Sequence, residues 1–317
     1  MTQTKLERLI RKEALIRRLP YPLLSFCLHT FIDPYNRLRH ERSRRYCGLQ
    51  DAPSCLDLGS NRRSDTVFIL GSGWSINNIS ESKWKTIKNH DSFGFNLWLR
   101  HAHVPSMYFS HVPDTRSANE MLLRCFIKLM EERAQDYKAV PKFIPFLHND
   151  PTHKFINAIP KAWRQNLYAI NTFTAVARSA QEVNREISNL LDNGWFRCNP
   201  TGPLKLFSYI GTIIQLMDLS VRMGYRRVIL CGVDMSDPRY FYEDLDQYPD
   251  MAGIRSSPPT QTTHQTLKQT RGHIPIDQVV YAMNDLVFEP NEIKLYVEHA
   301  GSALYPRIPL APPNIYD

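Results

Sequence analysis

The chain lacks any long apolar segment. None of its apolar runs approaches the roughly 20 residues that a transmembrane helix requires. The most apolar stretch, residues 20–32, contains two prolines and a histidine, and no A-x-A cleavage site follows it. We therefore expect neither a membrane-spanning helix nor a cleaved signal peptide.

Cysteine pairs with metal-binding spacing are also missing. The six cysteines include no C-x-x-C pair, so the spacing of a structural zinc site is absent, and we expect no metal site. At 317 residues the chain is too long for a small disulfide scaffold. Cys231 lies in the apolar run VILCGVD, which favours a buried hydrophobic role. The pattern indicates a protein of the reducing cytoplasm.

Net positive charge is nearly absent from residues 64–317. The formal net charge of the whole chain is +8, and 43% hydrophobic with 22% charged residues is typical of a globular protein. Residues 1–63 contain 13 Lys or Arg and 6 Asp or Glu, so +7 of the charge lies there. A basic cleft across the body, and with it a nucleic-acid partner, is therefore not expected.

The N-terminal segment has a basic amphipathic pattern. Over residues 2–18, Leu and Ile fall on one helical side with Lys and Arg between them. Such a helix, followed by the apolar residues 20–32, suits the surface of an anionic membrane. We expect residues 1–40 to be an extension that binds the inner face of the plasma membrane from the cytoplasm. A helix packed on the body, or an arm for homo-oligomerisation, is the alternative.

The remaining chain predicts an α/β fold. Residues 41–65 are polar and contain a proline and two glycines, so we interpret them as a linker. From residue 66 onward, short apolar runs alternate with segments of helical apolar spacing. Strands are predicted over 66–73, 91–99, 105–112, 140–147, 226–234 and 292–297, and helices over 117–137, 174–191, 209–225 and 276–287. This alternation predicts a single Rossmann-like, mostly parallel sheet with helices on both faces.

Ligands of such sheets bind beyond the carboxyl ends of the strands, so residues that follow strands are the candidates for a site. Gly71, Ser72 and Gly73 follow the first strand, where backbone N–H groups can contact a phosphate. Ile76 replaces the third glycine of the dinucleotide motif, so a tight structural turn is the alternative. Asn96 follows the second strand.

Two further candidate segments lie later in the chain. A helix is predicted to begin near Gly211 and Thr212, which offers either an anion site or an ordinary helix cap. The strand that ends at Gly232 and Asp234 leads into a turn that carries two tyrosines, whose hydroxyls can donate to a phosphate.

A long polar segment separates these tyrosines from a candidate histidine. Residues 243–272 are rich in Pro, Thr and Gln. Irregular segments of that length in compact domains are usually functional, so we interpret this one as a mobile lid. His273 follows the lid, where a group that titrates near neutral pH suits a general base.

Taken in order, these segments resemble the bacterial sialyltransferases of glycosyltransferase family 42. The resemblance covers roughly residues 66–312 and rests on order and spacing. The matching segments are 71–75 (the G-N-G-P-S-like turn), 93–96 (the R-C-N-like run), 211–212 (the T-S-G helix start), 224–234 (the G-Y-K-x-I-Y-L-S-G-I-D run), 272–273 (G-H-S) and 293–312 (the I-K-L-Y strand and proline-bearing tail).

The resemblance implies a GT-A-variant fold and inverting, metal-independent transfer from a CMP-sugar, with no cofactor. His273 would be the catalytic base, and Tyr242, with Tyr240, would hold the leaving phosphate. Ser236 stands where the family has its other tyrosine, and Ser72 and Ser110 stand where it has asparagines. The nucleotide is expected to contact Gly71, Ser72, Gly73, Asn96, Ser110, Gly211, Thr212, Gly232, Asp234 and Ser236.

The implied donor is sialic acid or another CMP-linked ulosonic acid, such as Kdo or a bacterial nonulosonate. The implied acceptor is a cell-surface glycan or lipopolysaccharide. Two other functions fit parts of the sequence. Asp244 and Asp246 form a D-x-D, which a metal-dependent UDP- or GDP-sugar transferase would use to hold Mn²⁺. A non-catalytic, membrane-associated nucleotide-binding protein is the third interpretation.

Overall fold

Residues 19–111, 120–145, 150–197, 204–254, 263–268 and 273–316 are described by a computed structural model. The nine strands that they contain pair in parallel throughout. The strands are β1 (Gln50–Asp51), β2 (Thr66–Leu70), β3 (Asp91–Phe95), β4 (Met107–Phe109), β5 (Lys142–Pro145), β6 (Leu167–Thr174), β7 (Lys205–Ser208), β8 (Arg227–Cys231) and β9 (Lys294–Val297). The prediction of an α/β fold with a parallel sheet is confirmed.

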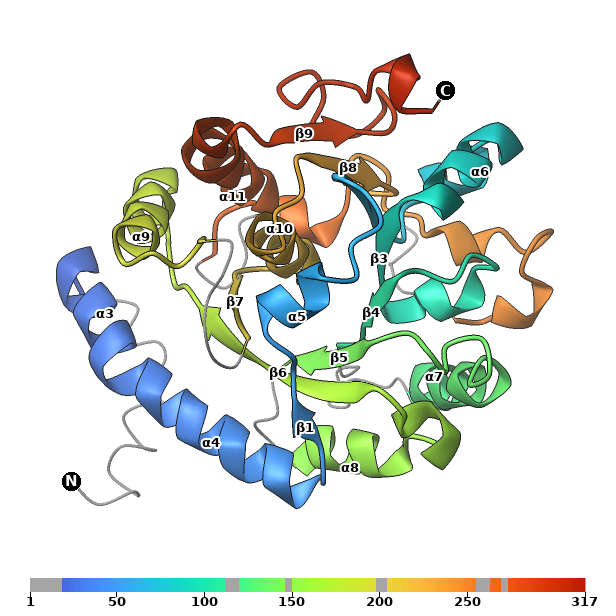
Figure 1. The fold of residues 1–317 in the computed structure, drawn as a ribbon, viewed down its shortest axis with the longest axis horizontal. Helices are drawn as coiled ribbons and strands as arrows, with labels where there is room; N and C mark the ends of the chain where they lie inside the picture. Colours follow the sequence, from blue (N-terminus) through green and yellow to red (C-terminus); the bar gives the residue numbers. More distant parts are fainter. Residues whose placement is uncertain are drawn as a thin grey trace.

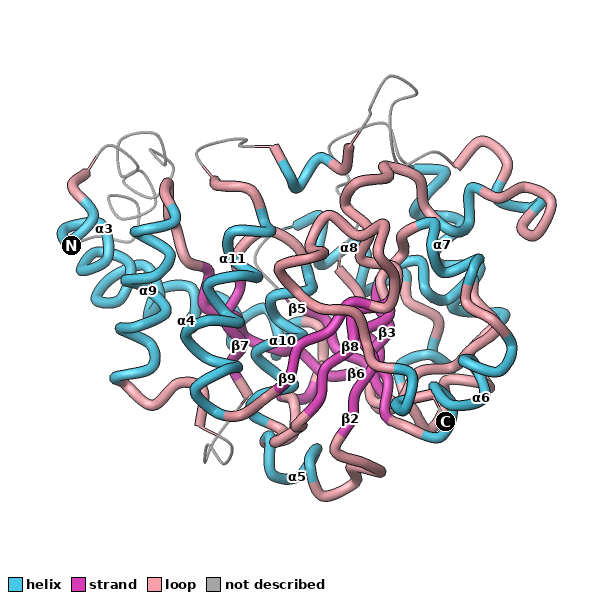
Figure 2. Tube along the Cα trace, turned by 90° about the horizontal axis from the view of Figure 1, so that it is seen from above, coloured by secondary structure: helices cyan, strands magenta, loops and turns pink. Residues whose placement is uncertain are grey.

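Helices cover both faces of this sheet (Figures 1 and 2). The α-helices are α3 (Tyr21–Cys27), α4 (Asp33–Tyr46), α5 (Cys55–Gly59), α6 (Glu81–Asn89), α7 (Glu120–Glu132), α8 (Asp150–Ala158), α9 (Ala180–Asp192), α10 (Thr212–Arg222) and α11 (Ile276–Met283), and a π-helical turn, η1 (Leu28–Ile32), joins α3 to α4. One core lies under α5, α9, α10 and α11, and the other lies under α6, α7 and α8.

Strand β2 illustrates how the sheet is buried on both faces. All five of its residues are buried. Val67 and Ile69 belong to the core on one face, whereas Phe68 and Leu70 belong to the core on the other. A strand covered on both faces needs apolar residues at nearly every position, which is why the run TVFIL predicts a strand so clearly.

The sheet reverses its direction of growth next to β2. The strand order is β1-β6-β5-β4-β3-β2-β8-β9, and β7 pairs with the carboxyl half of β6. Strands β3 to β6 therefore follow β2 to one side, whereas β8 and β9 lie on its other side. Ligands of doubly wound sheets bind at such a reversal, beyond the carboxyl ends of the strands.

Residues 41–65 are not a linker, and this prediction is corrected. They contain the end of α4, strand β1 and helix α5. Strand β1 pairs with β6, and Cys55 and Leu58 of α5 are buried in the core. The polar composition misled because β1 is an exposed two-residue strand and α5 is only five residues long.

The N-terminal helices pack on the body. The Tyr21 hydroxyl and the His29 Nε2 each lie 2.6 Å from the carboxylate of Glu186, which is buried on α9. The His29 ring also stacks on Phe173 of β6, with 4.7 Å between centroids. Residues 21–46 are thus part of the folded unit, which was the alternative expectation. The predicted helix over residues 2–18 lies outside the described residues.

Candidate functional site

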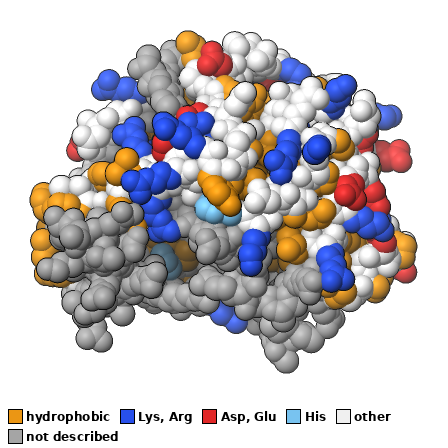
Figure 3. All heavy atoms as spheres, turned by 90° about the horizontal axis from the view of Figure 1, so that it is seen from below, with side chains coloured by type: hydrophobic (Ala, Val, Ile, Leu, Met, Phe, Trp, Pro, Cys, Tyr) orange, Lys and Arg blue, Asp and Glu red, His pale blue; other side chains and the backbone are white. Residues whose placement is uncertain are grey.

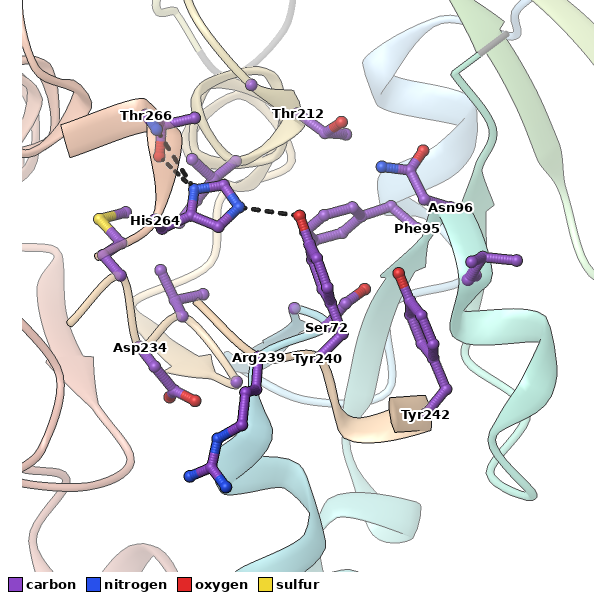
Figure 4. Close-up of a pocket in the computed structure, with 18 of the residues that line it drawn as sticks. Ser72, Phe95, Asn96, Thr212, Asp234, Arg239, Tyr240, Tyr242, His264 and Thr266 are labelled. Carbon is purple, nitrogen blue, oxygen red and sulfur yellow. Dashed lines mark hydrogen bonds between the residues drawn. The ribbon is translucent and has the colours of Figure 1, made fainter. Parts of the chain in front are cut away.

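A pocket of about 450 Å³ lies at the carboxyl ends of β2, β3, β4, β7 and β8, beside the reversal of strand order (Figure 4). Its lining includes eight of the ten residues expected to contact the nucleotide, and both expected tyrosines. These ten residues are Gly71, Ser72, Gly73, Asn96, Gly211, Thr212, Gly232, Asp234, Tyr240 and Tyr242. Segments far apart in the sequence therefore meet in one cavity.

The glycines after β2 allow its loop to touch the loop after β8. A Cβ atom on Gly71 would lie 2.3 Å from the carbonyl oxygen of Gly232, and one on Gly73 would lie 2.5 Å from a carboxylate oxygen of Asp234. The amides of Gly71 and Gly73 donate to the carbonyls of Cys231 and Gly232 at 2.7 and 2.8 Å. These two amides are therefore used within the protein, and the expectation that they are offered to a phosphate is corrected. Packing is what requires glycine here.

Asp234 fastens the same two loops together. One oxygen of its nearly buried carboxylate accepts from the Ser75 amide at 2.8 Å, and the other accepts from the Ser75 hydroxyl. The imidazole Nε2 of His299 lies 3.5 Å from this second oxygen. Because Asp234 also lines the pocket, the carboxylate fixes the shape of the wall as well as its charge.

Asn96 joins the ends of β3 and β4. It adopts a left-handed conformation with φ of 53°, which asparagine tolerates better than most residues. Its side-chain oxygen accepts from the His111 amide at 3.2 Å, and its backbone carbonyl accepts from the Tyr108 hydroxyl. With the oxygen so held, the amide nitrogen faces the pocket (Figure 4). Asn96 can therefore present a fixed donor to a ligand.

The start of α10 forms another part of the wall. Gly211 has a φ of 84° and precedes the buried Thr212, the first residue of the helix. Ile213 follows it in the pocket lining. The amino end of a helix attracts anions, so this wall adds a positive dipole end to the site.

Tyr240 and Tyr242 are held rigidly by the loop after β2. The Phe241 amide between them donates to the Ser72 carbonyl at 2.9 Å, and Tyr240 forms an antiparallel bridge with Gly73. Their rings stack with 5.3 Å between centroids and 6° between planes. Both hydroxyls point to the same side of the pocket (Figure 4). The pair presents two phenol groups to whatever occupies the cavity.

His264 is a pocket residue that the sequence analysis did not single out. Its Nδ1 accepts from the Thr266 amide at 3.3 Å and lies 2.7 Å from the Thr266 hydroxyl. A backbone amide can only donate, so the proton of the neutral ring is on Nε2, which donates to the Tyr240 hydroxyl at 3.0 Å. Burial lowers the pKa of His264, which keeps this neutral form at pH 7. His264 therefore orients Tyr240.

Arg239 is a second unexpected pocket residue. Its guanidinium pairs with Asp237 at 2.7 Å and lies over the ring of Trp74, 4.1 Å from the centroid. The ion pair with Arg239 lowers the pKa of Asp237. Arg239, Asp237 and Asp234 also line a neighbouring pocket of about 450 Å³, which is open to the surface beside His299. The site thus combines a cation with phenol and amide groups.

Three expected site residues are not in the described lining of the main pocket. His273 packs edge-to-face on Tyr209, with 5.2 Å between ring centroids. Ser110 is buried at the end of β4, where its amide donates to Phe143. Ser236 lines the neighbouring pocket and donates to the Gly301 carbonyl.

The D-x-D carboxylates also lie outside the described lining. Asp244 accepts from the Asp246 amide at 3.2 Å and from the Gln247 side chain at 3.0 Å. Within the part of the chain that the structure describes, no group of three His, Cys, Asp or Glu side chains is arranged to hold a metal ion. Residues 255–262 and 269–272 of the expected lid lie outside the described residues.

Comparisons with known proteins add no relative. No protein-family model matches the chain, and no curated protein sequence matches it.

Proposed function

We propose that the protein is an inverting glycosyltransferase that moves sialic acid or a related ulosonic acid from a CMP-sugar to a glycan or lipopolysaccharide acceptor without a metal ion. A hydroxyl oxygen of the acceptor attacks the anomeric carbon of the sugar acid. The bond from that carbon to the phosphate oxygen breaks, and CMP leaves with the bonding electrons. The hydroxyl proton passes to a base.

One observation carries the proposal. Ser72, Asn96 and Thr212 follow three different strands, β2, β3 and β7, and the two tyrosines lie in the loop after β8, yet all five residues line a single pocket. They lie in the segments whose order and spacing resemble those of the CMP-sugar transferases, with Ser72 in place of an asparagine of that family. A set of neutral donors at the reversal of a parallel sheet suits a nucleotide with one phosphate.

The tyrosines supply the stabilisation that the leaving group needs. Negative charge grows on the phosphate as CMP departs, and preorganised donors that face such a charge are usually the largest catalytic contribution. Tyr240 accepts from the His264 Nε2–H, which fixes the orientation of its hydroxyl. A phosphomonoester is a stable leaving group, so phenol groups can act where a diphosphate would call for a metal ion.

Arg239 accounts for an acidic donor sugar. Among the described residues that line the pocket, Arg239 is the only Lys or Arg. A CMP-linked ulosonic acid carries a carboxylate beside the anomeric carbon, in addition to its phosphate. The Arg239 guanidinium, which is paired with Asp237, is the group in the described lining that can pair with this second negative charge.

His273 is the proposed base. Its ring lies against Tyr209, whose hydroxyl accepts from the Ile274 amide at 2.8 Å. Tyr209 is two residues before Gly211, which lines the pocket. His264 is less suited to accept a proton, because Nδ1 is engaged by Thr266 and Nε2 already carries its proton. Replacing His273 with Ala should lower kcat about 100-fold or more while CMP affinity changes little.

A transfer assay tests the proposal. Purified protein is incubated with CMP-sialic acid or CMP-Kdo and a lipopolysaccharide acceptor, in the presence of EDTA, and released CMP and labelled product are measured. Tyr242→Phe should lower kcat about 100-fold, because a donor to the leaving phosphate is lost. Tyr248→Phe, a nearby tyrosine outside the described lining, is the matched control. Turnover that requires Mn²⁺ and a UDP- or GDP-sugar would refute the proposal.

A further inference from the structure

The outer side of the N-terminal helices is a second candidate binding surface. Residues 21–46 run as one continuous helical segment through α3, η1 and α4, along one edge of the molecule (Figure 1). On the inner side, Tyr21, Leu24 and Leu28 are buried against the body, and Tyr21 and His29 contact Glu186. The segment is therefore rigid, and its outer side has a fixed shape.

Large apolar side chains are exposed along this outer side. Five of the ten exposed large hydrophobic residues of the described chain fall within these 26 residues. They are Leu23 (47% exposed), Phe26 (55%), Phe31 (49%), Leu38 (60%) and Tyr46 (70%). Single exposed apolar residues are ordinary, but a concentration on one rigid edge indicates a contact surface.

Basic side chains accompany these apolar residues. Arg37, Arg42 and Arg45 are exposed on α4. Residues 1–46 contain 11 Lys or Arg against 4 Asp or Glu, so nearly all of the net charge of the protein lies here. Figure 3 shows Lys and Arg side chains interspersed with apolar ones on the face that lies below α4 and α8 in Figure 1.

We propose that the outer side of residues 21–46 is a peripheral binding surface for an anionic lipid bilayer. Phe and Leu side chains insert at the boundary between headgroups and acyl chains, while Arg side chains pair with lipid phosphates. No helix of the described chain is both long and apolar enough to cross a membrane. The surface is separate from the pocket residues, and its occupation does not depend on the proposed reaction.

The charge decides among the partners of such a surface. A two-fold contact with a second copy would place the same basic face against itself, which like charges oppose. A nucleic acid would satisfy the arginines but would leave Leu23, Phe26 and Phe31 without apolar contacts. An anionic bilayer satisfies both kinds of side chain.

Vesicle co-sedimentation of the full-length protein tests this surface. The vesicles contain phosphatidylcholine alone or mixed with phosphatidylglycerol. Two double variants, Phe26→Ser/Phe31→Ser and Arg37→Glu/Arg42→Glu, should each weaken binding to the anionic vesicles about tenfold or more. Added salt should weaken the binding of the wild-type protein. The matched controls are Leu56→Ser/Leu245→Ser and Lys85→Glu/Lys88→Glu, whose residues are exposed elsewhere on the molecule.

Thermal midpoints and CMP affinity are measured for every variant, so that a folding defect or a failure of the proposed reaction is distinguished from a loss of lipid binding. If thermal midpoints are unchanged and the two test variants alone lose binding to anionic vesicles, the proposed lipid-binding surface is supported. Equal binding to neutral vesicles, or wild-type binding by both test variants, would overturn it. A wild-type dimer that both test variants convert to monomer would show self-association instead.

Discussion

Single atoms decide which residues are allowed where the loops after β2 and β8 meet. A methyl group on Gly71 would lie 2.3 Å from a backbone oxygen, and backbone cannot yield as a flexible side chain can. Gly59 lies in α5, and a methyl group there would find its nearest neighbour at 3.5 Å, which is ordinary contact.

Gly71→Ala should therefore destabilise the protein by about 3 kcal/mol or more, since both loops must separate to admit the methyl group. Gly59→Ala, the matched control, should change the free energy of unfolding by less than about 1 kcal/mol. Urea denaturation of both variants measures the difference. Similar, small effects for the two would show that the loops are not in this close contact.

His264 carries the most specific prediction at the residue scale. Its Nε2–H donates to Tyr240, and His264→Phe keeps the ring but removes the donor. We expect CMP binding to weaken about tenfold and kcat to fall further, because the Tyr240 hydroxyl loses its fixed orientation. Calorimetry and initial rates measure the two effects.

A pH profile separates orientation from simple packing. Burial lowers the pKa of His264 below 6.5, so the ring stays neutral at pH 7 and takes up a proton only at lower pH. Protonation of Nδ1 would break its bond with the Thr266 amide, so CMP affinity of the wild-type protein should fall on the acidic side. If CMP affinity falls at acidic pH in His264→Phe just as it does in the wild-type protein, the role given to His264 is contradicted.

At the scale of elements, helix α10 depends on one buried carboxylate. Asp218 accepts from the Phe207 amide of β7 at 2.6 Å and from the indole of Trp195 at 3.0 Å. Asp218→Ala leaves both donors without this acceptor and should cost about 3 kcal/mol of stability. Asp218→Asn retains an acceptor oxygen and should cost less.

The pH dependence of Asp218 has the opposite sign to that of a paired carboxylate. Burial raises its pKa to about 6, above the unfolded value, so the native state binds a proton first as pH falls. The stability of the wild-type protein relative to Asp218→Asn should therefore rise between about pH 7 and pH 4. Denaturation curves across this range measure the difference, and a relative stability that falls with pH would contradict the assignment.

Docking of α3 has a pH dependence of its own. The hydrogen bond to Glu186 raises the pKa of His29, so this interaction contributes fully below about pH 6.5 and is lost as pH rises through the raised value. Hydrogen exchange of residues 21–32, corrected for intrinsic rates, should accelerate at alkaline pH. His29→Gln should exchange faster at neutral pH and lose that dependence. Identical profiles for the two proteins would show that His29 does not fasten α3.

At the scale of the whole molecule, the strands that the sequence predicts are those whose burial on both faces requires a continuous run of apolar residues. Strands β2 and β8 are covered on both faces, so their runs are continuous and were recognised. Strand β6 was not predicted, because its single partly exposed residues are separated by pairs of buried ones, which departs from strict alternation, and because it includes the polar residues Asn171 and Thr174. Strand β7 was missed because it has only four residues, of which Lys205 pairs with Asp33 of α4.

The same reasoning explains which site residues could be found. Residues directly after apolar strands, such as Ser72 and Asn96, are located by the strand that precedes them. His264 and Arg239 lie in irregular polar segments, where no periodicity marks one residue above another. The contacts of His264 with Tyr240 and of Arg239 with Trp74 depend on tertiary packing, which the sequence pattern does not encode.

Nucleotide binding tests the central claim most directly. The protein is titrated with CMP, UDP, GDP and NAD in EDTA and again with Mn²⁺, and the shift in thermal midpoint is measured. We predict that CMP stabilises the protein equally under both conditions, by about 2.7 kcal/mol at 100 times its dissociation constant. Asn96→Ala and Tyr242→Phe should reduce this stabilisation. Stabilisation by UDP or GDP that requires Mn²⁺, with no response to CMP, would contradict the account.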